Sequence, residues 1–332
     1  MANFNDFTFS SAFADDIEAF IRLKHGLGNV YHSPSIVLKS FDKFCYDNFR
    51  NENILSKEIV MAWHKRGIDR HLTPKTLRLN ITPISHFAKY QCDKGIPAYI
   101  FPTKTLPPEK RYTPHIYSTE ELIRFFNATD SCHISHQYPN RHLIMPVFFR
   151  LLYSCGLRVS EATNLLTDNV DLENGILKIV DSKNSGERLV PLSQDMHKRC
   201  ENYYQSVHCN NPHKYFFPAK TDDPIKYMNI YGNFRRFLKN AEISHGGKDN
   251  QIRIHDFRHT FAVHCLRNWV LEGKDLNTCY PYLKAYMGHT LFKYTTYYLR
   301  ITAEIYPMIG EALEAHYPDI IPFSGGDEYE SF

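Results

Sequence analysis

The chain has 332 residues, of which 43% are hydrophobic, and this is enough material for two domains with separate cores. Its 39 basic and 36 acidic side chains leave a formal net charge of +3, too small to indicate a nucleic-acid partner by itself but compatible with a local basic patch. The sequence has no apolar run of membrane-spanning length, no signal-peptide pattern and no Cys-x-x-Cys pair, so we expect a cytoplasmic protein with reduced thiols and no membrane partner.

The first part of the chain carries helical patterns. Apolar residues recur at helical spacing over residues 37–45, behind the helix-opening segment Ser33-Pro34-Ser35. A second helix is expected over residues 73–95, where Pro83 predicts a kink or a break. These patterns predict a helical N-terminal domain of about four helices over residues 1–103.

The clearest basic segment of the chain lies in this first domain. Its cations have few acidic neighbours and are Lys65, Arg66, Arg70, Lys75 and Arg78. A run of this kind is explained either by a solvated helix face or by contacts with backbone phosphates. Evidence for a DNA site elsewhere in the chain favours the second explanation.

A change of composition separates this domain from the next. Residues 104–115 are rich in proline and basic side chains and lack apolar periodicity, so we interpret them as a linker. The second domain is predicted over residues 116–332, with a helix start at Ser118-Thr119-Glu120-Glu121, where a hydroxyl cap precedes carboxylates. A further apolar helical run over residues 143–153 ends at Gly156.

A small sheet is predicted inside this second, otherwise helical domain. Short apolar runs at 170–172, 176–180 and 188–192 are joined by an Asn-Gly turn and a Ser-Gly turn, a pattern typical of antiparallel hairpins. Lys183 lies at the second hairpin. The expected fold is therefore mainly helical, of the α+β class, with a helical N-terminal domain and a small antiparallel sheet in the second.

The most informative residues follow the sheet. His255 and Arg258 are three residues apart and share one face of a helix, and Tyr298 lies nine residues after His289. Guanidinium groups grip phosphate oxygens through paired, charge-assisted hydrogen bonds, and a phenol close to such cations becomes a usable nucleophile. The residue types therefore suit metal-free attack on a phosphodiester.

The order of these segments resembles that of the tyrosine recombinases, the phage integrase family. The segment 156–162 (Gly-Leu-Arg-Val-Ser-Glu-Ala) is similar to the family's first arginine box, and Lys183 with residues 187–192 looks like its catalytic hairpin. The segment 255–262 (His-Asp-Phe-Arg-His-Thr-Phe-Ala) is similar to the second box, and Gly288-His289 to the third. The resemblance covers roughly residues 116–305, and the first domain is consistent with the family's core-binding domain.

The resemblance implies roles for named residues. The implied catalytic set is Arg158, Lys183, His255, Arg258, His289 and Tyr298. In this reading the two arginines clamp the scissile phosphate, Tyr298 forms a 3′-phosphotyrosyl bond, and Lys183 is the general acid. Glu161 is expected to orient Arg158. The implied partner is double-stranded DNA, bound by a homotetramer on two sites, without a small-molecule substrate and without a metal, ATP or other cofactor.

Several alternatives stay open at the level of sequence. Arg158 is also explained as a surface charge paired with Glu161, and Tyr297 competes with Tyr298 as nucleophile because adjacent helical residues point about 100° apart. Spacing from His289 favours Tyr298. The helix expected over residues 302–316 packs either on its own domain or on another subunit. The competing functions are a type IB topoisomerase, which shares this chemistry, and a non-catalytic DNA-binding protein on the same fold.

Overall fold

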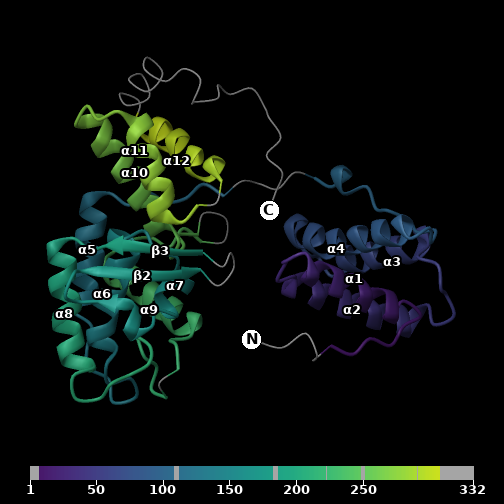
Figure 1. Ribbon diagram of the computed structural model, residues 1–332, viewed down its shortest axis with the longest axis horizontal. Coiled ribbons are helices and arrows are strands. Elements are labelled where there is room, and N and C mark those ends of the chain that lie inside the picture. The colour runs from purple at the N-terminus through teal and green to yellow at the C-terminus, as the bar shows by residue number, and fades with distance from the viewer. Residues whose placement is uncertain are drawn as a thin grey trace. The chain divides into compact units, whose positions relative to one another are not determined.

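A computed structural model of the chain describes residues 7–107, 112–181, 186–221, 223–247, 251–289 and 291–306 (Figure 1). The chain divides into two compact units, Met1–Arg111 and Tyr112–Phe332. Two predicted features fall outside the described residues, namely Lys183 and the part of the helix 302–316 that follows residue 306. Across the described ranges, every helix is too short or too polar to cross a membrane.

Helices form the described part of the first unit, as the apolar spacing predicts. They are α1 (Ala14–Gly26), α2 (His32–Asn48), α3 (Lys57–Asp69), α4 (Pro74–Asp93) and the short 3-10 helix η2 (Thr103–Thr105). Helix α4 packs against the other three α-helices. Their apolar faces enclose an aromatic-rich core, in which the rings of Phe41 and Trp63 meet edge to face with centroids 5.4 Å apart.

Two details of the helix starts and breaks differ from the sequence prediction. Helix α4 continues through Pro83, so the predicted break is wrong. Proline cannot donate to the carbonyl four residues earlier, but that residue, Leu79, is exposed, so water can satisfy its oxygen. Helix α2 begins at His32 rather than behind residues 33–35, and Pro34 is tolerated there because amides of a first turn have no partner in the helix.

The second unit is mainly helical and carries one small sheet. Its elements are α5 (Thr119–Asp130), α6 (Arg141–Ser154), α7 (Val159–Thr163), η3 (Thr167–Asn169), β1 (Val170–Asp171), β2 (Ile176–Asp181), β3 (Gly186–Pro191), α8 (Gln194–Val207), α9 (Tyr227–Asn240), α10 (Asp256–Leu271), α11 (Leu276–Met287) and α12 (Phe292–Ile305). Helix α5 opens with the predicted capping box, in which Ser118 and Glu121 each accept a hydrogen bond from the other's backbone amide.

The sheet confirms the predicted antiparallel hairpins. Its strand order is β1-β2-β3, with Ile179 paired to Arg188 and Leu177 to Val190. Side chains alternate between the two faces of a strand, so Arg188 lies on the same face as Val190, which is buried. Strand β3 packs against α11. The alternation therefore directs an arginine inward, toward the helices.

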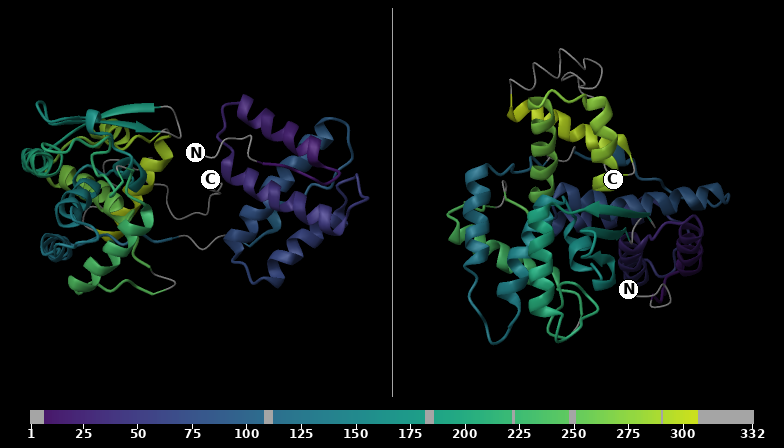
Figure 2. Two further views of the ribbon diagram at one scale, coloured as in Figure 1. Left: turned by 90° about the horizontal axis from the view of Figure 1, so that it is seen from below. Right: turned by 60° about the vertical axis from the view of Figure 1, so that its left-hand side comes forward.

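Helix α10 connects two apolar cores of the second unit. Phe257, near its start, belongs to the core built by α5, α6, α8, α9 and the sheet. Residues 262–266, further along, belong to a second core with α11 and α12, and these three helices lie together in Figures 1 and 2. Arg258 follows Phe257 directly, so it lies where the two cores meet.

Candidate active site

Arg258 is a buried cation at this junction. Its side chain is 2% exposed, and its guanidinium donates to the carbonyl oxygen of Gly156 at 2.6 Å and to that of Met287 at 2.5 Å. Burial lowers the pKa of Arg258 to about 10, against the opposing influence of Tyr298. The group therefore stays protonated at neutral pH, and its charge is fixed by backbone from two separate segments.

Glu161 is the buried anion of the site. Its carboxylate accepts four hydrogen bonds within the described residues: two from Arg158, one of them from the backbone amide, and two from Arg188, all between 2.7 and 2.9 Å. Arg258 lies 4.0 Å away. Burial alone would raise the pKa of Glu161, but the hydrogen bonds and charge of Arg188, with Arg158 and Arg258, bring it to about 2. Glu161 is thus ionised at any pH at which the protein works.

The C-terminal end of α11 binds all three arginines. Arg188 donates to the carbonyl of Tyr286 at 2.8 Å, Arg258 to that of Met287, and Arg158 to that of Gly288 at 3.2 Å. The last carbonyls of a helix have no partner in the helix and carry its partial negative charge, so cations stabilise this end. Gly288 ends the helix in the left-handed conformation, with φ at +64°. The next residue is His289, which this turn delivers to the site.

Tyr298 lies in α12 and is buried against the same group. Burial raises the pKa of Tyr298, while the nearby charge of Arg258 opposes that rise. The neighbouring Tyr297 is half-buried, and its ring lies beside that of Tyr298 at 5.7 Å. The burial of Tyr298 close to Arg258 supports the prediction that Tyr298 is the nucleophile.

Three histidine rings surround the phenol. The ring of His289 stacks on that of Tyr298 with centroids 5.8 Å apart, and its Nδ1 is 2.9 Å from the Thr295 hydroxyl. His255 directly precedes α10 and is exposed at the surface. Nearby protein nevertheless desolvates its ring, and this desolvation, together with the charges of Arg258 and Arg158, lowers the pKa of His255. Burial, and to a smaller extent the positive charge of Arg258, likewise lowers the pKa of His289 to about 3.

Sequence reasoning did not assign the third histidine, His259, to the site. Its ring lies 4.8 Å from that of His255 and 5.5 Å from that of Tyr298. Its Nδ1 is buried and has no hydrogen-bond partner among the described residues. The signal in the sequence is its place directly after Arg258 in the second box. His264, further along α10, is hydrogen-bonded to the Tyr153 hydroxyl at 3.0 Å and is a satisfied interior histidine outside the site.

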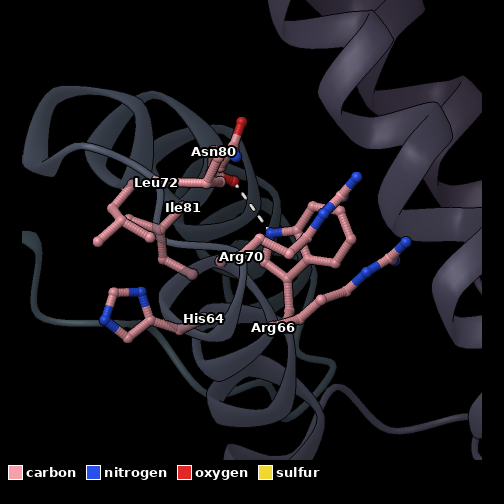
Figure 3. A pocket seen from close by; sticks show the side chains of 9 residues that line it. His64, Arg66, Arg70, Leu72, Asn80 and Ile81 are labelled. Carbon is pink, nitrogen blue, oxygen red and sulfur yellow. Dashed lines mark hydrogen bonds between the residues drawn. The ribbon is translucent and has the colours of Figure 1, made fainter.

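The basic segment lies in the first unit. Lys65, Arg66, Arg70 and Lys75 are exposed, whereas Arg78 is half-buried and donates to backbone carbonyls of residues 103, 106 and 107, each at 3.1 Å. Figure 3 shows Arg66 and Arg70 extending to one side of a small pocket beside Trp63. The pocket holds about 30 Å³, room for a water but not for a base.

Comparison with known proteins identifies the class of protein to which the chain belongs. The sequence matches the phage integrase family over residues 118–304. It is 27% identical over 323 residues to a Sinorhizobium fredii protein with the provisional name integrase/recombinase y4rB, covering 93% of this chain and 99% of that protein. It is 27% identical over 200 residues to the tyrosine recombinase XerC of Staphylococcus saprophyticus, covering 60% and 61% respectively. A crystal structure of a lambda integrase dimer bound to a COC' core site has a similar fold, with a TM-score of 0.60 and 14% identity over 84% of this chain and 93% of that one.

The fold and the family match define an enzyme that breaks and rejoins DNA strands. The chain belongs to the phage integrase family, whose match spans more than half of its length. It is a site-specific recombinase of the tyrosine type, and it acts on DNA. The predicted family and the predicted fold class are both confirmed.

Proposed function

We propose that Tyr298 is the nucleophile of this recombinase and attacks a DNA phosphate to form a 3′-phosphotyrosyl bond. The observation that carries the proposal is the place of the buried phenol: its ring lies against those of His259 and His289, and the nearby charge of Arg258, beside the network of Arg158 and Glu161, favours its ionised form. As the new oxygen–phosphorus bond forms, the bond to the 5′-oxygen breaks and that oxygen leaves as a hydroxyl. The phosphotyrosyl bond conserves the energy needed for rejoining, so the proposed reaction consumes no nucleotide and requires no metal.

The two arginines of the boxes are the proposed phosphate clamp. Arg158 keeps 31% of its side chain exposed, whereas Arg258 is almost fully buried, so Arg158 is the more accessible cation and Arg258 the more deeply anchored one. Negative charge grows on the nonbridging oxygens in the transition state, and guanidinium donors fixed in advance stabilise it without reorganising. Their anchoring to Glu161 and to the end of α11 supplies that fixed geometry.

Proton movement is assigned to the histidines and the lysine. The lowered pKa values of His255 and His289 keep both rings neutral at pH 7, so each ring can accept a proton from the phenol or donate a hydrogen bond to the phosphate. Lys183 is the proposed general acid for the 5′-oxygen. That role rests on its place between β2 and β3 and on the family resemblance.

DNA is proposed to bind to both units. The lambda integrase structure contains a dimer on a core site, and on this basis we propose two protomers on each site and a homotetramer on two paired sites. Residues 1–103 would form the core-binding domain, residues 104–115 the linker and residues 116–332 the catalytic domain. The proposed phosphate contacts of the first domain are Lys65, Arg66, Arg70, Lys75 and Arg78. The proposed location is the cytoplasm, as expected from the sequence.

Covalent capture tests the assignment of the nucleophile. Randomly nicked genomic fragments from the source organism are incubated with the protein, denatured, and the protein-linked DNA is sequenced. Wild type and Tyr297→Phe should yield the same linked site, whereas Tyr298→Phe should yield none while still binding the duplex recovered by the wild type. An adduct with Tyr298→Phe and its loss with Tyr297→Phe would move the nucleophile to Tyr297.

The two competing functions are separated with the recovered site. An adduct excludes a protein that only binds DNA. A type IB topoisomerase works alone on one duplex, so it would relax supercoiled DNA without resolving a synthetic four-way junction built from two recovered sites. We expect junction resolution, because a recombinase must exchange strands between two duplexes.

A further inference from the structure

Arg188 on β3 is a buried arginine to which the reaction proposed above gives no role. Both terminal nitrogens of its guanidinium bond to Glu161, to Oε1 at 2.9 Å and to Oε2 at 2.8 Å. Its Nε donates to the carbonyl of Tyr286 at 2.8 Å. Only 11% of the side chain is exposed. A single planar group thus joins the sheet, α7 and the end of α11.

The contacts of Arg188 indicate indirect action. A guanidinium has five N–H donors, and here the three nitrogens that carry them all face protein oxygens. Arg158, by contrast, keeps nearly three times as much of its side chain exposed. Of these two cations on one carboxylate, Arg158 is therefore the more accessible one, and Arg188 is the one more enclosed by protein oxygens.

Without Arg188, Glu161 could bind the Arg158 guanidinium through both of its carboxylate oxygens. Arginine and carboxylate prefer a two-pronged pair, and the two residues are three apart at the start of α7. In the structure the Arg158 guanidinium makes one bond to Glu161, to Oε1 at 2.7 Å, while Arg188 bonds to both oxygens. Occupation by Arg188 opposes closure of Arg158 onto Glu161 and leaves the Arg158 guanidinium oriented between Glu161 and Gly288.

Arg188 also contacts the turn that carries His289. A Cβ added at Gly288 would come within 2.9 Å of the Arg188 guanidinium, so that side chain packs directly on the turn. Its bond to the Tyr286 carbonyl fixes the last turn of α11 just before it. One side chain thus sets the position of elements that bear two of the proposed phosphate ligands, Arg158 and His289.

We propose that Arg188 is a positioning residue of the strand-cleavage reaction: it saturates Glu161 so that Arg158 faces the phosphate, and it fixes the turn that presents His289. This inference rests on the proposed function, since it assumes that Arg158 and His289 touch the scissile phosphate. It assigns to β3 a part in catalysis that is distinct from carrying the hairpin with Lys183.

The chain offers a control arginine of similar burial in an ion pair away from this site. Arg150 in α6 also makes a two-pronged bond, to both oxygens of Asp130 at 2.7 Å, and its side chain is 13% exposed, whereas that of Asp130 is 47% exposed. Neither residue contacts the network around Glu161 in the described residues. Substitution of Arg150 therefore reports what the loss of a comparable arginine costs through packing and stability alone.

The experiment compares Arg188→Lys, Arg188→Ala, Arg150→Lys and Arg150→Ala on the duplex recovered by covalent capture. Lysine keeps the charge but cannot make the planar two-pronged bond, so Arg188→Lys is informative even if Arg188→Ala fails to fold. We expect both Arg188 variants to cleave about 10- to 100-fold more slowly at saturating protein, the range typical for residues that orient a functional ligand, with DNA affinity unchanged. The Arg150 variants should cleave at the wild-type rate.

A double-mutant comparison tests the route through Glu161. Because part of the effect runs through Glu161 and part through the turn, Arg188→Ala combined with Glu161→Gln should be slower than Glu161→Gln alone but faster than the product of the two single losses predicts. The inference would be overturned if the two single losses of cleavage rate simply multiplied in the double variant, or if Arg188→Lys cleaved at the wild-type rate. It would also be overturned if the Arg150 variants lost as much cleavage rate as the Arg188 variants. A loss of DNA affinity with a normal cleavage rate at saturating protein would overturn it as well. Failure of the wild-type protein to form any adduct would instead refute the proposed function.

Discussion

Replacing Glu161 by glutamine should change how the second unit responds to acid. In the wild type the carboxylate is held by Arg158 and Arg188 and lies near Arg258, and its pKa falls to about 2. A carboxyl whose pKa is lower in the folded state than in the unfolded state stabilises the fold above its unfolded pKa. That stabilisation disappears as the pH falls toward the folded pKa. Glutamine has no such titration.

The magnitude follows from the size of the shift. The pKa falls from an ordinary value of 4.5 to about 2, and one pKa unit corresponds to about 1.4 kcal/mol, so the contribution is about 3 kcal/mol. The side chain is almost fully buried, so little of this is lost to solvent screening. The wild type should lose about 3 kcal/mol more than Glu161→Gln between pH 5 and pH 2. At neutral pH Glu161→Gln should already be less stable than the wild type, because the guanidinium groups of Arg158 and Arg188 lose the anion that pairs with them.

The two tryptophans of the chain provide the assay. Trp63 lies in the core of the first unit and Trp269 in α10 of the second. In a Trp63→Phe background, the fluorescence of the remaining tryptophan follows unfolding of the second unit. Denaturant titrations at a series of pH values then give the free energy of unfolding with and without Glu161.

Parallel curves would refute the reasoning. If the wild type and Glu161→Gln lose stability equally from pH 5 to pH 2, then the carboxylate is not held by the arginines in solution. A difference that appears only above pH 6 would point to a histidine instead, since a lowered histidine pKa changes stability in that range.

Two further predictions concern the backbone and the basic segment. Gly156→Ala should destabilise the second unit by about 1–3 kcal/mol, because its φ is +56° and the new Cβ would meet an aromatic ring at 2.5 Å, whereas Gly232→Ala in α9, with open space, should be neutral or stabilising in the same titration. The exposed cations Lys65, Arg66 and Arg70 are replaced together by alanine. The triple variant should bind the recovered duplex more weakly, and the salt dependence of its affinity should have a slope smaller by about 0.9 per lost phosphate contact. An unchanged slope would show that the segment is not part of the DNA interface.

Local signals in the sequence were sufficient for most of the fold. The capping box at Ser118, the turn of the sheet at Asn174-Gly175 and the apolar spacing of the helices each describe interactions over a few residues, and the described part of the chain contains them. The error at Pro83 has a different origin. A proline breaks a helix only where the freed carbonyl stays unsatisfied, and whether Leu79 reaches water depends on which face of α4 is buried.

The candidate site was predictable where its chemistry lies within short boxes. His255 and Arg258 are fixed by one helix, and the spacing from His289 selects Tyr298, which lies close to Arg258 in the structure. The spacing does not specify which carbonyls anchor the arginines. Gly156 and Met287 are more than a hundred residues apart, and only the folded chain brings both to Arg258.

Arg188 shows where local sequence patterns stop being sufficient and tertiary packing must be known. Val190 is buried and Leu189 is exposed, and the alternation along β3 places Arg188 on the face of Val190, so an inward arginine follows only once the buried face of the strand is known. A buried arginine requires an anion, and Glu161 is one of the acidic residues near the boxes. The choice among those acids, however, depends on packing of β3 against α11, which places the guanidinium between Glu161 and the carbonyl of Tyr286. Strand register and the observed burial together therefore indicate that Arg188 needs a partner, and tertiary packing determines that the partner belongs to the candidate site.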